Sequence, residues 1–255
     1  MSLASPSTTH GASPPLDVLA IGPHPDDVEL FVGGTIARLV AAGHRVAILD
    51  LTRGEAATRG TPELRADEAR RAAEVLGVAR ERLDLPDGGV RDTPEQVAAL
   101  VTRLRAHRPE LVLAPWTDER HPDHAAAAAL IVRAVFLASA GGFMPELPRH
   151  VVREVLHYPM RVAARPSFVV DISAFSDVKR RAIACHASQL QPGPGATTLV
   201  ASALATIDAR DRYWGEHIGA TYGEPFIIRA TLAIDDPVAH FRARPGAPRL
   251  FEDAP

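Results

Sequence analysis

The chain has 255 residues, of which 46% are apolar and 23% charged, a composition that is typical of a soluble globular protein and excludes a disordered, collagen-like or coiled-coil chain. A formal net charge of −3 gives no indication of a nucleic-acid partner or of an acidic membrane surface. The single cysteine, Cys185, excludes a disulfide framework within the chain, and no run of about 18 uninterrupted apolar residues is present that would span a membrane, so we expect a cytoplasmic protein.

The first half of the chain alternates short apolar runs with amphipathic segments. The runs predict strands at residues 17–22, 45–51, 82–85 and 111–114, and the segments after them predict helices at residues 30–42, 63–76, 94–107 and 123–138. Strands that alternate with helices of about 10–15 residues are typical of βαβ units. Because crossovers between parallel strands are right-handed, this pattern predicts an α/β fold with a mostly parallel sheet and helices on both faces.

The second half is less regular. It predicts strands at 152–158, 168–171 and 226–232, helices at 173–187 and 198–215, and a loop at 189–195. No change of composition marks a second domain, so we expect a single domain over residues 16–232. Residues 1–15 are expected to form a disordered leader, without the basic start and apolar core of a signal peptide, and residues 233–255 a loose tail.

Two clusters of histidine and aspartate follow predicted strands at their carboxyl ends. The first, PHPDDVE, covers residues 23–29 after the first strand, and the second, HPDH, covers residues 121–124 after the fourth. In a doubly wound sheet with strand order 3-2-1-4 these two strands are neighbours, and ligands bind where the chain reverses direction between them. We therefore expect the two clusters to face each other across this edge of the sheet.

The residue types in the clusters suit a catalytic metal ion. His24, Asp27 and His124 would supply three protein ligands and leave a position open for water. Two imidazoles with one carboxylate suit Zn²⁺, although Fe²⁺, Co²⁺ or Mn²⁺ would also be accepted. Asp26 points away from its neighbour and is free to take a proton from the attacking water. His121, with Asp123 nearby, can stabilise an oxyanion or protonate a leaving amine.

Each of these residues has a simpler interpretation. Asp26 or Asp27 could cap the following helix, and a lone histidine is more often a hydrogen-bonded surface residue than a ligand. The coincidence of two such clusters at adjacent strand ends favours the metal site. Arginine forks near the clusters suit a substrate carboxylate or a sugar hydroxyl, although a solvated surface charge is the alternative for each of them. These candidate substrate-binding residues are Arg53, Arg65 and Arg120.

At these two motifs the sequence resembles the PIG-L/LmbE-like N-acetylglucosaminyl deacetylases, whose signature is HPDD-x-E after a strand and a later HPDH. The resemblance extends from about residue 16 to 229. Further stretches are similar to the subgroup that deacetylates N-acetylglucosaminyl-malate in bacillithiol biosynthesis; they are DLTRGE at 50–55, GTPELR at 60–65, LPDGG at 85–89 and DERH at 118–121. The family implies a Rossmann-like fold that binds one zinc ion and is often assembled as a homo-hexamer.

The resemblance also implies roles for individual residues. Carried over by motif, they are zinc ligation by His24, Asp27 and His124, general-base catalysis by Asp26, oxyanion stabilisation by His121 oriented by Asp123, and substrate contact by Arg65. Some relatives have a mobile tyrosine before the late helix, whereas residues 197–207 contain none. Either the metal and His121 suffice, or Tyr158 or Tyr222 takes its place.

The implied activity is hydrolysis of the acetamide of an N-acetylglucosaminyl conjugate, a small-molecule amino-sugar substrate. Its aglycone would be malate or, as alternatives, a second sugar as in chitobiose, or inositol. Two other classes stay open at this point. A metal-dependent phosphoesterase would need a second metal ion, for which Glu55 is the main candidate ligand. A non-catalytic sugar-binding protein would not need a water-activating base.

Overall fold

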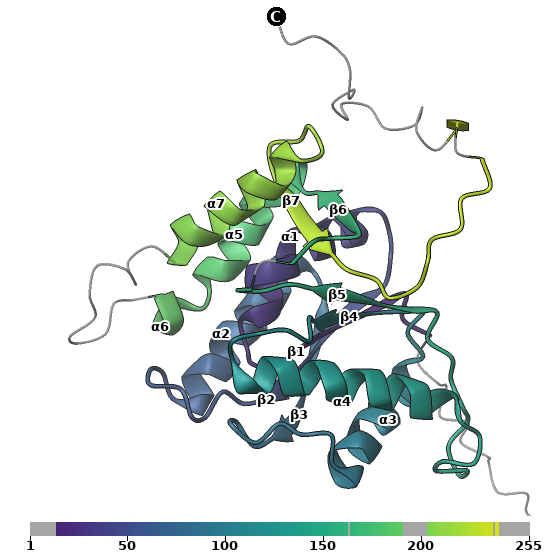
Figure 1. Cartoon of the computed structure of the whole chain (residues 1–255). Coiled ribbons are helices and arrows are strands. Elements are labelled where there is room, and N and C mark those ends of the chain that lie inside the picture. Colours follow the sequence, from purple (N-terminus) through teal and green to yellow (C-terminus); the bar gives the residue numbers. More distant parts are fainter. Residues whose placement is uncertain (1–13, 163, 191–202, 237, 240–255) are drawn as a thin grey trace, which may run out of the picture.

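The structure, a computed structural model, describes residues 14–162, 164–190, 203–236 and 238–239. Its centre is a five-stranded parallel sheet with the strand order β3-β2-β1-β4-β5, and β6 and β7 form a separate antiparallel pair (Figure 1). The strands are β1 (Val18–Gly22), β2 (Val46–Thr52), β3 (Ala79–Leu85), β4 (Leu111–Pro115), β5 (Glu154–Tyr158), β6 (Phe168–Asp171) and β7 (Gly223–Phe226). The helices are α1 (Asp27–Ala41), α2 (Pro62–Leu76), α3 (Pro94–His107), α4 (Pro122–Ser139), α5 (Ser176–Ala184), α6 (Ala187–Leu190) and α7 (Ala203–Glu216), with a 3-10 turn at Ser173–Phe175.

This arrangement confirms the predicted α/β fold, a mostly parallel sheet with helices on both faces in a single domain. The predicted neighbours β1 and β4 pair in parallel, with Val18 opposite Leu111, and β5 extends the sheet on the far side of β4. α3 and α4 cover one face of the sheet, and α1, α5 and α7 lie on the other (Figure 1). The residues of the predicted leader from 1 to 13, and those of the predicted tail at 237 and 240–255, lie outside the described part of the chain.

Several predicted boundaries differ from those observed. β3 begins at Ala79 rather than residue 82, because an edge strand that pairs only with β2 tolerates the polar sequence ARERLDL. The strand predicted at 226–232 lies instead at Gly223–Phe226, where it pairs with β6; only Ile227 continues, as a bridge to His157. The helix predicted at 173–187 divides into the 3-10 turn, α5 and α6. α6 also occupies the first two residues of the predicted 189–195 loop, whose remainder lies outside the described residues, as do residues 198–202 of the last predicted helix.

Local signals explain where two of the helices begin. The Thr61 hydroxyl accepts a hydrogen bond from the Leu64 N–H at 3.2 Å at the start of α2, and Thr93 accepts one from Gln96 at 3.4 Å at the start of α3. Both threonines precede a proline at the first helical position, where the missing N–H costs nothing. α2 ends at Leu76 and is capped by Gly77, whose φ of +73° favours glycine.

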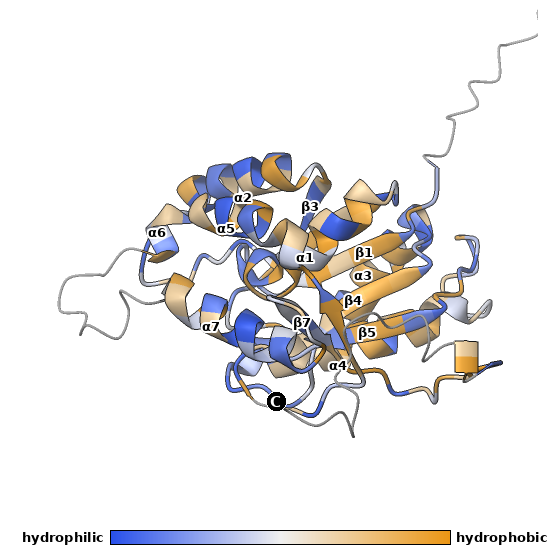
Figure 2. Ribbon diagram, turned by 90° about the horizontal axis from the view of Figure 1, so that it is seen from above, coloured by the Kyte–Doolittle hydropathy of each residue, from blue (hydrophilic) through white to orange (hydrophobic). Residues whose placement is uncertain are grey.

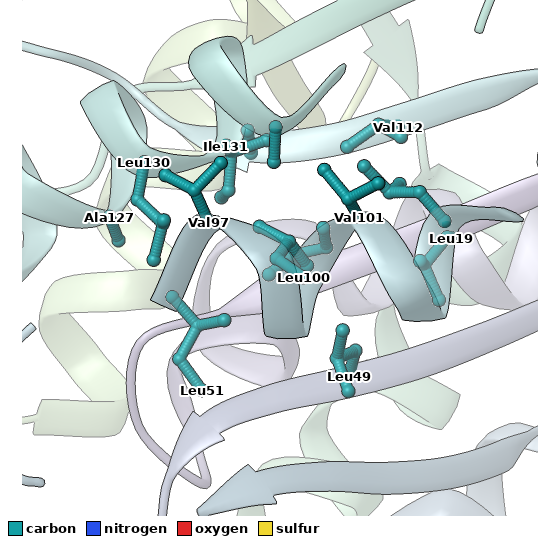
Figure 3. Packing of buried hydrophobic residues seen from close by; sticks show 14 of the residues in the cluster. Leu19, Leu49, Leu51, Val97, Leu100, Val101, Val112, Ala127, Leu130 and Ile131 are labelled. Carbon is teal, nitrogen blue, oxygen red and sulfur yellow. The ribbon is translucent and has the colours of Figure 1, made fainter. Parts of the chain in front are cut away.

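Apolar side chains form a separate core on each face of the sheet. On the face covered by α3 and α4, strand residues of β1, β2 and β4 meet helix residues that recur at helical spacing (Figure 3). The labelled contributors are Leu19, Leu49, Leu51, Val97, Leu100, Val101, Val112, Ala127, Leu130 and Ile131. On the other face, α1 contributes Phe31 and Ile36 against β1, β2 and β4. Burial on both faces explains why β1 and β2 are apolar throughout, apart from Asp50 and Thr52.

Among the described helices, α4 alone is long and apolar enough to span a membrane by length and composition. Its residues Ala127, Leu130 and Ile131 are fully buried and belong to the core beneath the sheet. Figure 2 shows α4 beside the apolar strands β4 and β5. This packing is that of a core helix in a globular domain.

A buried ion cluster ties the last strand to α1. Lys179 Nζ of α5 lies 2.5 Å from Asp211 Oδ2 of α7 and 2.7 Å from Glu224 Oε1 of β7. The two oxygens of Glu224 also accept the N–H groups of Gly34 and Thr35 at 2.9 and 2.7 Å. The lysine side chain is 2% exposed, so its charge depends on these carboxylates for compensation.

We expect Lys179→Met to destabilise the fold by about 3–5 kcal/mol, because Glu224 would be left buried without its counter-ion and Asp211 would keep only Arg210. Urea unfolding followed by circular dichroism measures the change. Arg153→Met is the matched control, since the Arg153–Glu110 pair at 3.1 Å is exposed and should contribute no more than about 1 kcal/mol. Equal losses in the two variants would contradict the assigned role of the cluster.

Candidate metal centre and active site

The two histidine–aspartate clusters meet at the carboxyl edge of the central sheet. The first cluster follows β1 and leads into α1, and the second follows β4 and opens α4. Because β1 and β4 are parallel neighbours, both loops leave the sheet at the same edge. Gly22 at the end of β1 allows the chain to turn closely, since a Cβ there would lie 2.9 Å from the Val28 side chain.

One carboxylate oxygen brings the candidate ligands together. Asp27 Oδ2 lies 3.1 Å from His24 Nδ1 and 3.3 Å from His124 Nε2. One ligand atom from each of the three residues lies within 4.8 Å of the others, and all three side chains are buried. The backbone N–H of His24 also donates to Asp27 Oδ2 at 3.0 Å, which fixes the carboxylate toward the imidazoles rather than toward the helix.

The donor set fits a catalytic zinc ion. Two imidazoles and a carboxylate make up the three protein ligands of such sites, which keep a fourth position open. The nitrogen of His124 that would bind the ion is Nε2, which faces Asp27 Oδ2 at 3.3 Å, whereas Nδ1 is buried without a hydrogen-bond partner within the described ranges. A second grouping, of His24, His121 and Asp123, meets the same distance criterion and shares His24 with the first.

Charge compensation in the cluster is reciprocal. Burial alone would raise the pKa of Asp27, but the charges and hydrogen bonds of His124 and His24 hold it well below its ordinary value. Burial would likewise lower the pKa of His24, yet hydrogen bonds to Asp27 and Asp87 raise it to about 11. Three carboxylates, those of Asp27, Asp87 and Asp123, therefore converge on one imidazole, and such a site attracts a cation.

Asp26 is held in an unusual backbone conformation. Its φ of 143° lies in the region that favours glycine, which costs roughly 1–3 kcal/mol for other residues. Asp26 occupies the N-cap position of α1, but its side chain makes no capping hydrogen bond, so the simpler interpretation as a cap does not apply. Burial and the neighbouring Asp27 raise its pKa to about 6, against the opposing effect of Arg65. Asp26 is absent from the groups of clustered ligands among the described residues.

Arg65 links the loops after β1 and β2 by hydrogen bonds, one of which is to Asp26. Its Nη2 donates to the Pro25 carbonyl at 3.0 Å and to Asp26 Oδ1 at 3.3 Å, and its Nη1 donates to the Gly54 carbonyl at 2.9 Å. Gly54 has φ +67°, and a Cβ there would lie 2.0 Å from Arg65 Nη1. The guanidinium, only 3% exposed, thus joins the loop after β1 to the loop after β2.

His121 and Asp123 lie beside the ligands but pair differently from the expectation. The His121 ring stacks on His124 with centroids 4.7 Å apart, and His121 Nδ1 accepts the backbone N–H of Asp123 at 3.2 Å. An accepting Nδ1 leaves the proton of the neutral ring on Nε2. Burial, His124 and His24 lower the pKa of His121. The Asp123 carboxylate accepts the Gly88 N–H at 2.7 Å instead of contacting the His121 ring.

Asp87 is a member of the site that sequence reasoning missed. The residue types at 87–89 indicate only a turn, but Asp87 Oδ1 lies 3.2 Å from His24 Nε2. Asp87 Oδ2 accepts the Ala56 N–H at 2.8 Å, and the Asp87 N–H donates to Glu55 at 2.9 Å. The signal was available, because Asp87 follows β3 at the same carboxyl edge of the sheet from which the other clusters were found.

The remaining candidates lie further out. Arg53 is half-buried, with Nη2 3.5 Å from Glu63 Oε1. Arg120 is exposed and lines a cavity rather than the metal cluster. Neither tyrosine considered as a substitute is free for that role in this structure. The Tyr158 hydroxyl is fully buried and donates to the Ile21 carbonyl at 2.7 Å, and the Tyr222 hydroxyl accepts hydrogen bonds from Arg180 at 2.5 Å and from Arg212.

Known N-acetylglucosaminide deacetylases are similar to this chain. The family model described as PIG-L, GlcNAc-PI de-N-acetylase, matches residues 19–135, which include both motifs. A diacetylchitobiose deacetylase of Thermococcus kodakarensis is 38% identical over 188 residues, 68% of this chain and 69% of that protein. A 1D-myo-inositol 2-acetamido-2-deoxy-alpha-D-glucopyranoside deacetylase of Kineococcus radiotolerans is 33% identical over 169 residues, 50% of this chain and 47% of its own length. This chain thus spans about half of that relative.

A different reaction also occurs among the similar proteins. A 4-oxalmesaconate hydratase of Pseudomonas putida is 28% identical over 195 residues, 69% of this chain and 75% of that protein. Among solved structures, the conserved protein TT1542 from Thermus thermophilus superposes with a TM-score of 0.80 and 42% identity, covering 86% of this chain and 98% of that one.

The geometry predicts about one zinc ion per chain. Asp27→Ala removes the oxygen that both imidazoles face and should abolish zinc retention on gel filtration, measured as the metal-to-protein ratio. Asp87→Ala removes an outer partner of His24 and should weaken zinc affinity about 10- to 100-fold. Asp118→Asn, an exposed change on the loop after β4, is the control. Zinc content unchanged in Asp27→Ala would disprove the centre.

Proposed function

Because this chain belongs to the PIG-L/LmbE family of deacetylases, we propose that it is a metal-dependent N-deacetylase that hydrolyses the acetamide of an N-acetylglucosaminyl conjugate. The observation that carries the proposal is the placement of Asp26. Asp26 adjoins the cluster of His24, Asp27 and His124, yet Arg65 holds its carboxylate at 3.3 Å, outside that cluster. A pure metal-binding or sugar-binding site has no use for a second, half-buried carboxylate in a strained conformation.

In the proposed reaction, water attacks the acetamide carbonyl carbon, the C–N bond breaks, and acetate and a free amino sugar leave. A zinc ion held by His24, Asp27 and His124 would supply polarisation of the carbonyl and a lower pKa for the attacking water. Asp26 takes the proton from the water, and this proton passes to the departing nitrogen. The Nε2–H of His121 donates to the oxygen that gains negative charge, in a ring orientation fixed by the Asp123 N–H.

Three other reactions or roles have less support. The hydratase relative is 28% identical to this chain, against 38% for the chitobiose deacetylase. A phosphoesterase with two metal ions would need Glu55, but the Glu55 carboxylate accepts the N–H groups of Arg53 and Asp87 and does not belong to a clustered ligand group among the described residues. A non-catalytic sugar-binding protein leaves the environment of Asp26 unexplained.

The finer proposal is that the conjugate is N-acetylglucosaminyl-malate, the bacillithiol precursor. The stretches that resemble that subgroup surround the candidate centre. Residues 50–55 and 85–89 are joined by the hydrogen bond from the Asp87 N–H to Glu55, and residues 60–65 end in Arg65, which reaches Gly54. A cytoplasmic location fits a soluble precursor of this kind.

The decisive variant is Asp26→Asn. It keeps the shape of the side chain but removes the base, so acetate release should fall by about 10²- to 10⁴-fold while zinc content stays at the wild-type level. Release of free amine is measured on N-acetylglucosaminides with malate, inositol or a second sugar as aglycone, with and without added zinc. Asp118→Asn, exposed on the loop after β4, is the matched control and should keep both activity and metal.

Two outcomes would overturn this proposal. Full activity in Asp26→Asn would show that Asp26 is not the general base. Hydration of 4-oxalmesaconate by the wild type, together with no release of amine from any of the three conjugates, would assign the chain to the reaction of the hydratase relative instead.

A further inference from the structure

The lining of a cavity of about 440 Å³ includes the loops after β4 and β5, which leave the central sheet at the same carboxyl edge as the loops of the candidate metal centre. Its walls come from the loop after β4, the loop after β5, α1 and α7. The lining residues that matter are Arg120, Arg161, Arg210, Phe31, Tyr213 and Trp214. Two of these walls also build the metal centre, because α1 begins with Asp27 and Arg120 directly precedes His121. We call this space the arginine cavity.

The arginine cavity concentrates positive charge without acidic residues in its lining. Arg120 and Arg161 are exposed, and within the described part of the chain no carboxylate forms a salt bridge with either guanidinium. Arg210 pairs with Asp211 at 3.2 Å, so among the residues that the structure describes it is the one of the three arginines with a carboxylate partner. Two neighbouring guanidiniums without a partner carboxylate leave room for an external anion.

Hydrogen bonds fix the loop backbone and one of the arginine side chains of the cavity. The Glu119 carboxylate accepts the backbone N–H groups of Met160 and Arg161, at 2.6 Å and 3.1 Å, which fastens the loop after β5 to the loop after β4. Arg210 donates to the Pro159 carbonyl at 2.5 Å. The guanidiniums of Arg161 and Arg210 lie 6.0 and 5.3 Å from the centre of the Phe31 ring, so an aromatic side chain supports both cations.

We infer that the arginine cavity binds an anionic aglycone, a carboxylate or phosphate group attached to the N-acetylglucosamine whose acetamide lies at the metal centre. Arg120 and Arg161 offer guanidinium groups that form no salt bridge among the described residues, and Arg210 offers one that Asp211 and the Pro159 carbonyl hold in place. This inference rests on the proposed function and adds a specificity site to it. Arg65 and Arg53, the other candidates for such contacts, are engaged by Asp26 and Glu63.

The test compares Arg161→Gln with Arg165→Gln, a change of an exposed arginine on the same loop that does not line the cavity. Values of kcat/KM are measured on three N-acetylglucosaminides, with malate, with phosphate or with a neutral sugar as aglycone. We expect Arg161→Gln to lower the ratio of the anionic to the neutral value about 10- to 100-fold, as one lost charged hydrogen-bond pair predicts, and Arg165→Gln to leave this ratio unchanged. Comparison of the malate conjugate with the phosphate conjugate shows which of the two anions the cavity prefers.

A binding measurement separates this inference from the proposed function. Calorimetry of malate and of inorganic phosphate with the zinc-loaded protein should show binding of at least one of the two anions. We expect Arg161→Gln to weaken this binding and Arg165→Gln to leave it unchanged. If the anion bound to the zinc ion instead, its affinity would be the same in both variants. If the wild type releases no amine from any conjugate, the proposed function fails and calorimetry alone decides on the cavity. An unchanged ratio, or an unchanged affinity for both anions in Arg161→Gln, would overturn the inference.

Discussion

The candidate site depends on one carboxylate. Asp27 Oδ2 faces the imidazoles of His24 and His124, which arrive from opposite sides of the switch between β1 and β4. Without the Asp27 carboxylate, the imidazoles of His24 and His124 would share no ligand atom at which an ion could bind. The parallel pairing of β1 and β4 is the constraint that makes the meeting possible, because it sends both loops out at one edge of the sheet.

Around this centre, carboxylates with little access to solvent are paired with arginine or lysine side chains. Arg65 neutralises Asp26 and joins two loops, Lys179 anchors β7 to α1 through Glu224, and Arg80 pairs with both Asp50 and Glu29 behind the site. Each of these cations costs desolvation that its hydrogen bonds offset. The arrangement explains how a chain with a single lysine holds several buried acids next to a site that requires ionised carboxylates.

Reaction and specificity are assigned to different parts of the same edge. The candidate centre does not define the substrate by itself, because similar proteins include both a diacetylchitobiose deacetylase and a 4-oxalmesaconate hydratase. In the specificity site that we propose, selection among conjugates depends on the loops after β4 and β5, which line the arginine cavity. Such a division is common in α/β enzymes, in which a rigid sheet positions the catalytic residues and differences in the surrounding loops change the substrate.

The α/β fold, the order of the four N-terminal strands and the residue types of both clusters follow from the amino-acid sequence alone, because apolar runs, helix caps and strand-end motifs are local patterns. Boundaries failed where tertiary pairing overrides local pattern, as in polar β3 and in β7 beside β6. The position of Asp87 after β3 could have been inferred from the sequence, but three features became visible only in the folded chain: which imidazole Asp87 contacts, the hydrogen bond of the Asp123 carboxylate to Gly88, and the presence of Arg161 and Arg120 in the lining of one cavity. All three bring together groups from different loops, and their partners depend on how the strands are ordered and how closely the loops pack, which no local pattern encodes.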